Sequence, residues 1–234
     1  MRLSIGGSYG TFASGVERLA RWTFWLALLA LLVPALLQAQ TSAQAKPIRI
    51  VVLGDSLSAG YGLSGAAAFP ARLQKALQAK GLNVEMTNAG VSGDTASGGR
   101  DRLDWSVPDG TDAVILELGA NDGLRGIDPE VTRAALSDIL TRLKARHIRV
   151  LLCGMLAPPN YGADYATRFN ALYPALAKSF DIPLYPFFLT GVAADARLNQ
   201  ADGLHPTEEG VDTIVTHILP TVEAFLGPLS GQRS

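Results

Sequence analysis

The stretch IRIVVLGDSLSAGYG, residues 48–62, decides the architecture that this chain adopts. Its first six residues are aliphatic or β-branched apart from one arginine, which is typical of a strand buried on both faces. The run stops at Gly54, and Asp55 and Ser56 follow where the strand gives way to a turn. Strands of this kind belong to parallel sheets that helices cover on each side, so the stretch predicts an α/β fold.

Further short apolar runs repeat this pattern along the chain, with helical spacing between them. We predict strands over 48–53, 83–88, 112–118, 148–154 and 182–188, and helices over roughly 70–81, 129–147, 163–179 and 207–226. The alternation favours a three-layer α/β/α sandwich of about five parallel strands with right-handed crossovers. Ligands bind at the carboxyl ends of such strands, so reactive residues are expected there.

The beginning of the chain is typical of an export signal rather than of this domain. Residues 22–37, WTFWLALLALLVPALL, form an apolar run that follows Arg18 and Arg21 and precedes small and polar residues. A membrane anchor is the alternative, but the run is shorter than the roughly 20 residues of a spanning helix and contains Pro34. We therefore predict that residues 1–45 are a signal peptide that is removed. Residues 46–228 are predicted to form a single domain, and residues 229–234 a disordered tail. The domain would be periplasmic or secreted, without stable membrane insertion.

Composition limits the classes of protein and partner. The 234 residues are 48% hydrophobic and 18% charged, which fits one medium-sized domain. A formal net charge of −1 does not indicate the basic surface that binds phosphates, so nucleic acid is not expected as a partner. Cys153 is the only cysteine, so no disulfide forms within the chain, and its apolar run RVLLCGML predicts a core position. Nothing in the sequence requires more than a monomer.

Polar residues gather just after the predicted strands, in GDSL, NAGVSGDT and GANDG, and in DGLHP before the last helix. The glycines after the first strand lack the G-x-G-x-x-G spacing of a dinucleotide site, and the chain has no phosphate-binding loop. The G-x-S-x-G elbow is absent there as well. The three histidines have no metal-ligand spacing, so no metal site is expected.

His205 and Asp202 suggest a base for Ser56. Asp55 and Ser56 could simply cap a helix, which both residue types often do. However, a carboxylate three residues before His205 can reach Nδ1 of the imidazole and leave Nε2 free to accept a proton. A serine becomes a good nucleophile when such a base takes its proton. Ser92 is a rival nucleophile, but it does not sit where a strand meets its helix.

Attack by serine on a carbonyl creates a negatively charged oxygen that needs hydrogen-bond donors. Three suitable donors lie at predicted strand ends: the backbone N–H of Ser56, the backbone N–H of Gly93 and the side-chain amide of Asn121. Glycine at position 93 lets the substrate oxygen approach the backbone closely. Together these residues are consistent with acyl transfer.

The blocks GDSLSAGYG, SGDT, GAND and DGLHP resemble, in order and spacing, those of the SGNH (GDSL) hydrolase family. The resemblance covers nearly all of the chain after residue 46 and is strongest to bacterial periplasmic enzymes with acyl thioesterase, arylesterase or lysophospholipase activity. It implies a flavodoxin-like sheet of order 2-1-3-4-5 and no cofactor. It also implies that Ser56 is the nucleophile, that Gly93 and Asn121 are oxyanion donors, and that Asp202 orients the general base His205. One departure is Ala120, where close relatives often have glycine.

This resemblance implies a serine esterase that hydrolyses esters and thioesters of medium or long acyl chains, including lysophospholipids. The apolar side chains of Leu124, Ile127, Leu156 and Tyr161 are expected to contact the acyl chain, and Asp55 to brace the turn through hydrogen bonds. One alternative keeps the same triad but removes acetyl groups from cell-envelope carbohydrate. Another is a catalytically silent module that binds lipid or glycan.

Overall fold

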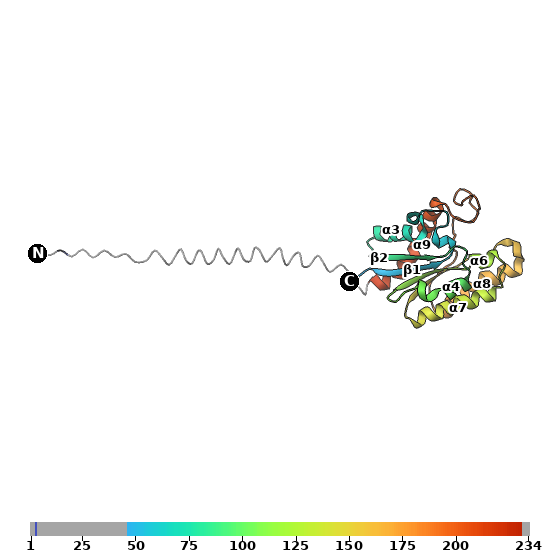
Figure 1. Cartoon of the computed structure of the whole chain (residues 1–234), viewed down its shortest axis with the longest axis horizontal. Coiled ribbons are helices and arrows are strands. Elements are labelled where there is room, and N and C mark those ends of the chain that lie inside the picture. The colour runs from blue at the N-terminus through green and yellow to red at the C-terminus, as the bar shows by residue number, and fades with distance from the viewer. Residues whose placement is uncertain (1–2, 4–45, 231–234) are drawn as a thin grey trace. The chain divides into compact units, whose positions relative to one another are not determined.

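A computed structural model describes residue 3 and residues 46–230 of the chain (Figure 1). The predicted signal peptide at 1–45 lies outside the described residues, apart from Leu3. Within residues 46–230, no helix is both long and apolar enough to cross a membrane.

One sheet of five parallel strands forms the centre of the domain, in the order β2-β1-β3-β4-β5. This order and the surrounding helices confirm the predicted α/β/α fold. All five residues of β3 are buried, as expected for a strand covered on both faces. The strands are β1 Ile48–Gly54, β2 Val84–Gly90, β3 Ala113–Glu117, β4 Arg149–Cys153 and β5 Leu184–Tyr185.

Strand β5 is much shorter than the predicted run over 182–188. Only Leu184 and Tyr185 pair with β4, and a proline stands on each side of them. Pro183 and Pro186 have no N–H group to donate to a neighbouring strand. The edge strand β5 is therefore only two residues long.

Helices cover the two faces of the sheet (Figure 1). Helix α3 packs against α9 on one face, and α7 lies between α4 and α8 on the other. The α-helices are α2 Ser56–Ala59, α3 Phe69–Ala79, α4 Ala96–Asp101, α5 Leu103–Ser106, α6 Ala120–Leu124, α7 Pro129–Ala145, α8 Gly162–Phe180 and α9 Glu208–Ser230, and two 3₁₀ turns are η1 Gly65–Ala67 and η2 Pro159–Tyr161.

Two helix ends show how local sequence sets the boundaries. Asp128 caps α7 by accepting a hydrogen bond from the N–H of Glu130, and Pro129 occupies the first turn, as predicted. Helix α9 includes Leu229 and Ser230, the first two residues of the predicted tail, because Leu229 packs against the core. Residues 231–234 lie outside the described residues.

Candidate active site

The turn between β1 and α2 presents Ser56 at the carboxyl end of β1. Asp55 caps α2, with its carboxylate accepting a hydrogen bond from the N–H of Leu57 at 3.0 Å. A side chain at Gly54 would collide with its surroundings, because an added Cβ would lie 2.3 Å from Oγ of Ser58. Asp55 is therefore the N-cap of α2, a role that aspartate often has. Because Gly54 has no side chain, the chain can turn tightly here, and Ser56 becomes the first residue of the helix.

The loop that carries His205 is closed on itself and tied to the Ser56 turn. Asn199 and Pro206 form an antiparallel bridge, and the N–H of Gln200 donates to the carbonyl of His205 at 2.7 Å. The Gln200 side chain also donates to the carbonyl of Tyr61 at 2.7 Å. The Tyr61 ring lies against the imidazole of His205, with ring centroids 4.5 Å apart. These contacts hold the imidazole beside the start of α2.

Ser56, His205 and Asp202 form a hydrogen-bonded row. Oγ of Ser56 lies 2.9 Å from Nε2 of His205, and Nδ1 lies 2.6 Å from Oδ2 of Asp202. The other carboxylate oxygen accepts backbone N–H bonds from Leu204 and His205 at 2.9 and 3.0 Å. The bonds from His205, the backbone one above all, and from Leu204 lower the pKa of Asp202 to about 2. An ionised Asp202 favours a proton on Nδ1, which leaves Nε2 able to take the proton of Ser56.

Gly93 lies in the turn that follows β2, and Asn121 lies in the short helix α6 that follows β3. The carbonyl of Val91 accepts from the N–H of Asp94, and Gly93 at the third position of this turn has φ of +86°, a conformation that favours glycine. The Asn121 amide donates to the carbonyl of Asp94 at 2.9 Å and to Oδ2 of Asp55 at 3.2 Å. The amide and the Gly93 turn are thus joined to each other, and Asp55 joins them to the residue before Ser56.

Arg102 joins the strand ends to the Gly93 turn, although nothing in the sequence pattern predicted a role for it. Its guanidinium donates to the carboxylate of Asp94 at 2.5 Å and to the carbonyls of Gly54 and Ala89 at 2.8 Å. Only 13% of its side chain is exposed. Arg102 therefore ties the ends of β1 and β2 to the Gly93 turn. Two of its partners are backbone carbonyls, which carry no signature in the sequence.

Three carboxyl side chains lie fully buried around the turn, at Asp55, Glu117 and Asp122. Asp122 accepts from the N–H of Ala96 and from the hydroxyl of Thr132, both at 2.9 Å, and so fixes α6 to α4 and α7. Our reading of the sequence missed Glu117, although an acid inside the apolar run DAVILEL was a signal for it.

The four residues predicted to contact an acyl chain lie on and near α6 and η2. Leu124, Leu156 and Tyr161 are 42%, 50% and 41% exposed, and Ile127 is half-buried. The Tyr161 hydroxyl donates to the carbonyl of Leu124 at 2.9 Å, so two of the four are in contact. Their contact with substrate stays a prediction.

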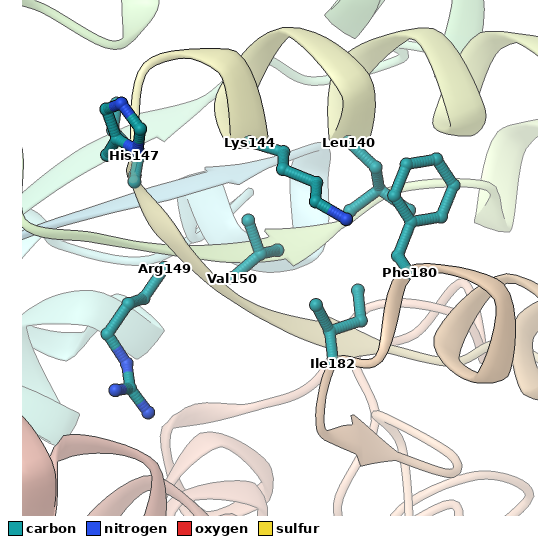
Figure 2. A pocket seen from close by; sticks show the side chains of 8 residues that line it. Leu140, Lys144, His147, Arg149, Val150, Phe180 and Ile182 are labelled. Carbon is teal, nitrogen blue, oxygen red and sulfur yellow. The ribbon is translucent and has the colours of Figure 1, made fainter.

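A cavity of about 290 Å³ opens at the other end of the sheet (Figure 2). It lies at the beginning of β4, whereas Ser56 follows the carboxyl end of β1, and the strands are parallel. No serine, threonine or cysteine lines it, so it offers no hydroxyl or thiol nucleophile. Its lining residues are Leu140, Lys144, His147, Ile148, Arg149, Val150, Phe180 and Ile182.

Sequence and structure comparisons find similar proteins. A sequence model of the GDSL-like lipase/acylhydrolase family matches residues 52–212, a span that includes Ser56, Gly93, Asn121, Asp202 and His205. The chain is 44% identical over 161 residues to thioesterase 1/protease 1/lysophospholipase L1 of Escherichia coli K12, which covers 68% of this chain and 76% of that protein. It is 38% identical over 192 residues to esterase TesA of Pseudomonas aeruginosa, covering 82% and 94% of the two chains.

A solved structure is similar over most of the chain. The crystal structure of AlinE4, an SGNH-hydrolase family esterase, superimposes with a TM-score of 0.66 at 44% sequence identity. The match covers 79% of this chain and 99% of AlinE4.

Proposed function

The chain belongs to the GDSL-like lipase/acylhydrolase family and is an ester-hydrolysing enzyme, and on that premise we propose that Ser56, His205 and Asp202 are its catalytic triad. The observation that carries this proposal is the continuous row of contacts, 2.9 Å from Ser56 to His205 and 2.6 Å from His205 to Asp202. Nucleophile, base and orienting acid are each within hydrogen-bond reach of the next, as acyl transfer by serine requires.

The reaction follows from these positions. His205 takes the proton of Ser56 at Nε2 while Oγ attacks the acyl carbonyl carbon, and the carbonyl oxygen becomes negatively charged. The N–H groups of Ser56 and Gly93 and the Asn121 amide stabilise that charge; one such donor is typically worth about 10²-fold to 10³-fold in rate. His205 then protonates the departing alcohol or thiol and leaves an acyl group on Ser56. His205 then takes a proton from water, which attacks the acyl-enzyme, and returns that proton to Oγ of Ser56 as the carboxylic acid leaves.

We further propose that the substrates are small esters and thioesters with medium or long acyl chains, such as lysophospholipids. The Escherichia coli relative, named thioesterase 1/protease 1/lysophospholipase L1, supports this class. The exposed apolar side chains of Leu124, Leu156 and Tyr161 support it too, because they offer surface on which an acyl chain can be buried.

A series of p-nitrophenyl esters from acetate to palmitate tests the acyl-chain proposal. We expect kcat/KM to rise by roughly threefold to fourfold for every methylene group that the site buries, since each contributes about 0.8 kcal/mol. Leu156→Ala should weaken this dependence on chain length, whereas Trp105→Ala, which changes another exposed apolar residue, should not. A sharp optimum at acetate would contradict the proposal and favour the carbohydrate O-acetyl esterase instead.

The proposed location of this activity rests on the N-terminal sequence. We propose that residues 1–45 are a signal peptide and that the domain acts as a monomer in the periplasm or outside the cell. An exported esterase would meet esters and lysophospholipids of the cell envelope.

A further inference from the structure

Two fully buried carboxyl side chains, Asp55 and Glu117, belong to the Ser56 turn and to the strand end that pairs with β1. Glu117, the last residue of β3, stands opposite Gly54 in the parallel register, and the N–H of Asp55 points to Oε2 of Glu117 at 3.4 Å. Two carboxylates at such a site repel each other and both lose their hydration, so one of the pair is expected to keep its proton.

The hydrogen-bond donors around the pair indicate which carboxyl carries the charge. Each oxygen of Asp55 has a donor, the N–H of Leu57 for one and the Asn121 amide for the other. Glu117 has both donors on Oε2, and the closer one is the Ser58 hydroxyl at 2.7 Å. Its buried Oε1 has no hydrogen-bond partner among the described residues. A buried carboxylate oxygen without a donor is costly, so hydrogen bonding favours a charged Asp55 and an uncharged Glu117.

The electrostatic surroundings point the same way. Burial, together with the nearby Asp55 charge, raises the pKa of Glu117 well above its ordinary range. Burial raises the pKa of Asp55 only to about 6, because the bonds from Leu57 and Asn121 and the charge of His205 oppose it, although Asp122 adds to it. Asp55 therefore ionises first.

The groups that face Glu117 from the neighbouring elements supply no counter-charge. Cys153 on β4 pairs in register with Glu117, and burial keeps its thiol protonated by raising its pKa. Burial likewise raises the pKa of Tyr173 on α8, whose hydroxyl donates to the carbonyl of Leu118 at 2.9 Å. On the β1 side the Arg102 guanidinium is bound to Asp94 and to backbone carbonyls. Within residues 46–230, Glu117 forms no ion pair.

We propose that Glu117 is a positioning residue that acts as a neutral acid: it ties the nucleophile turn to β3 and leaves the negative charge of the pair on Asp55. The tie runs through the Ser58 hydroxyl, two residues after Ser56, and through the N–H of Asp55. The inference rests on the proposed function, because it concerns the groups that hold the nucleophile and the oxyanion donor.

The charge on Asp55 has a consequence for Asn121. Both hydrogens of the Asn121 amide are donated in the free enzyme, to the carbonyl of Asp94 at 2.9 Å and to Asp55 at 3.2 Å. Asp55 and the Asp94 carbonyl thus fix the orientation of the amide in the free enzyme, and a charged Asp55 strengthens the bond that it accepts.

Substitutions at Glu117 and Asp55 test this assignment of charge. Glu117→Leu should lower kcat at least about tenfold, because the Ser58 hydroxyl loses its acceptor, whereas Glu117→Gln, a neutral residue of the same shape, should restore most of that loss. Asp55→Asn should lower kcat about tenfold to hundredfold with little change in KM, since one amide oxygen cannot accept from both Leu57 and Asn121.

The pH dependence of stability separates this role from simple packing. Between the ordinary pKa of a glutamate and the raised pKa of Glu117, folded wild-type protein binds more protons than unfolded protein, so its stability falls as pH rises. Glu117→Gln lacks this proton. The unfolding equilibrium constant of the wild type should therefore increase relative to that of Glu117→Gln by up to about tenfold per pH unit in that window.

The opposite results would overturn the inference. One is a Glu117→Gln enzyme whose kcat is as low as that of Asp55→Asn. The other is an unfolding equilibrium constant of the wild type that decreases, relative to that of Glu117→Gln, as pH rises. If Glu117→Gln fails to fold, infrared spectra of the wild type decide: a buried protonated carboxyl band at neutral pH supports the inference, and its absence contradicts it. Ester hydrolysis by the wild type, measured in parallel, tests the proposed function separately, because the stability and infrared results do not depend on it.

Discussion

Ser56→Ala is expected to lower kcat for p-nitrophenyl ester hydrolysis by about 10⁶-fold, the scale seen when a serine nucleophile is removed from a triad. The reason is the position of Oγ, 2.9 Å from Nε2 of His205, because methyl at this position can neither attack a carbonyl nor donate a proton. The measurement is steady-state hydrolysis, with circular dichroism to confirm that the variant folds.

Ser92→Ala is the matched control for this substitution. Ser92 is exposed, belongs to the same edge of the sheet and was the rival nucleophile in the sequence. Its removal should leave kcat within about tenfold of wild type, since the base His205 lies beside Ser56 instead. A Ser56→Ala enzyme that keeps most of its activity while Ser92→Ala loses it would reverse the assignment.

Asp202→Asn is expected to lower kcat by about 10²-fold to 10⁴-fold. Asp202 accepts the Nδ1 hydrogen of His205 on one oxygen and two backbone N–H groups on the other. Asparagine has a single acceptor oxygen, so one of these sets is lost, and its amide N–H favours the imidazole tautomer with the proton on the wrong nitrogen.

The pH profile sharpens this second prediction. Because the pKa of Asp202 is about 2, the wild-type carboxylate stays ionised from about pH 5 to about pH 9, and the loss in Asp202→Asn should persist across that range. Asp195→Asn is the control, since Asp195 lies nearby in the chain but pairs with Arg197. A loss that disappears at the acid end, or an equal loss in both variants, would count against Asp202 as the orienting residue.

Sequence reasoning could predict the fold because its signals are local. Runs buried on both faces and the helices between them predicted a parallel sheet, and the family resemblance predicted the strand order that β1 to β5 adopt. The exception is β5, where the apolar run 182–188 looked like a strand but Pro183 and Pro186 leave it two residues long.

The candidate site divides in the same way. Asp202 and His205 are three residues apart, so their contact could be expected from spacing. The position of Ser56, where a buried strand gives way to a turn, indicated the nucleophile. The supporting groups could not be found this way, because they act over long sequence separations on partners without side-chain signatures. Arg102 binds the carbonyl of Gly54, and Gln200 binds that of Tyr61. Each link becomes visible only when the loops are folded together.

The most direct test of the triad is to map the residue that a fluorophosphonate modifies in the active enzyme. Such a reagent forms a covalent bond with a serine only when a base activates it, so peptide mass spectrometry should find a single adduct on Ser56, and His205→Ala should greatly reduce its rate of formation. An adduct on Ser92, or an enzyme that hydrolyses esters without any adduct on Ser56, would contradict the account.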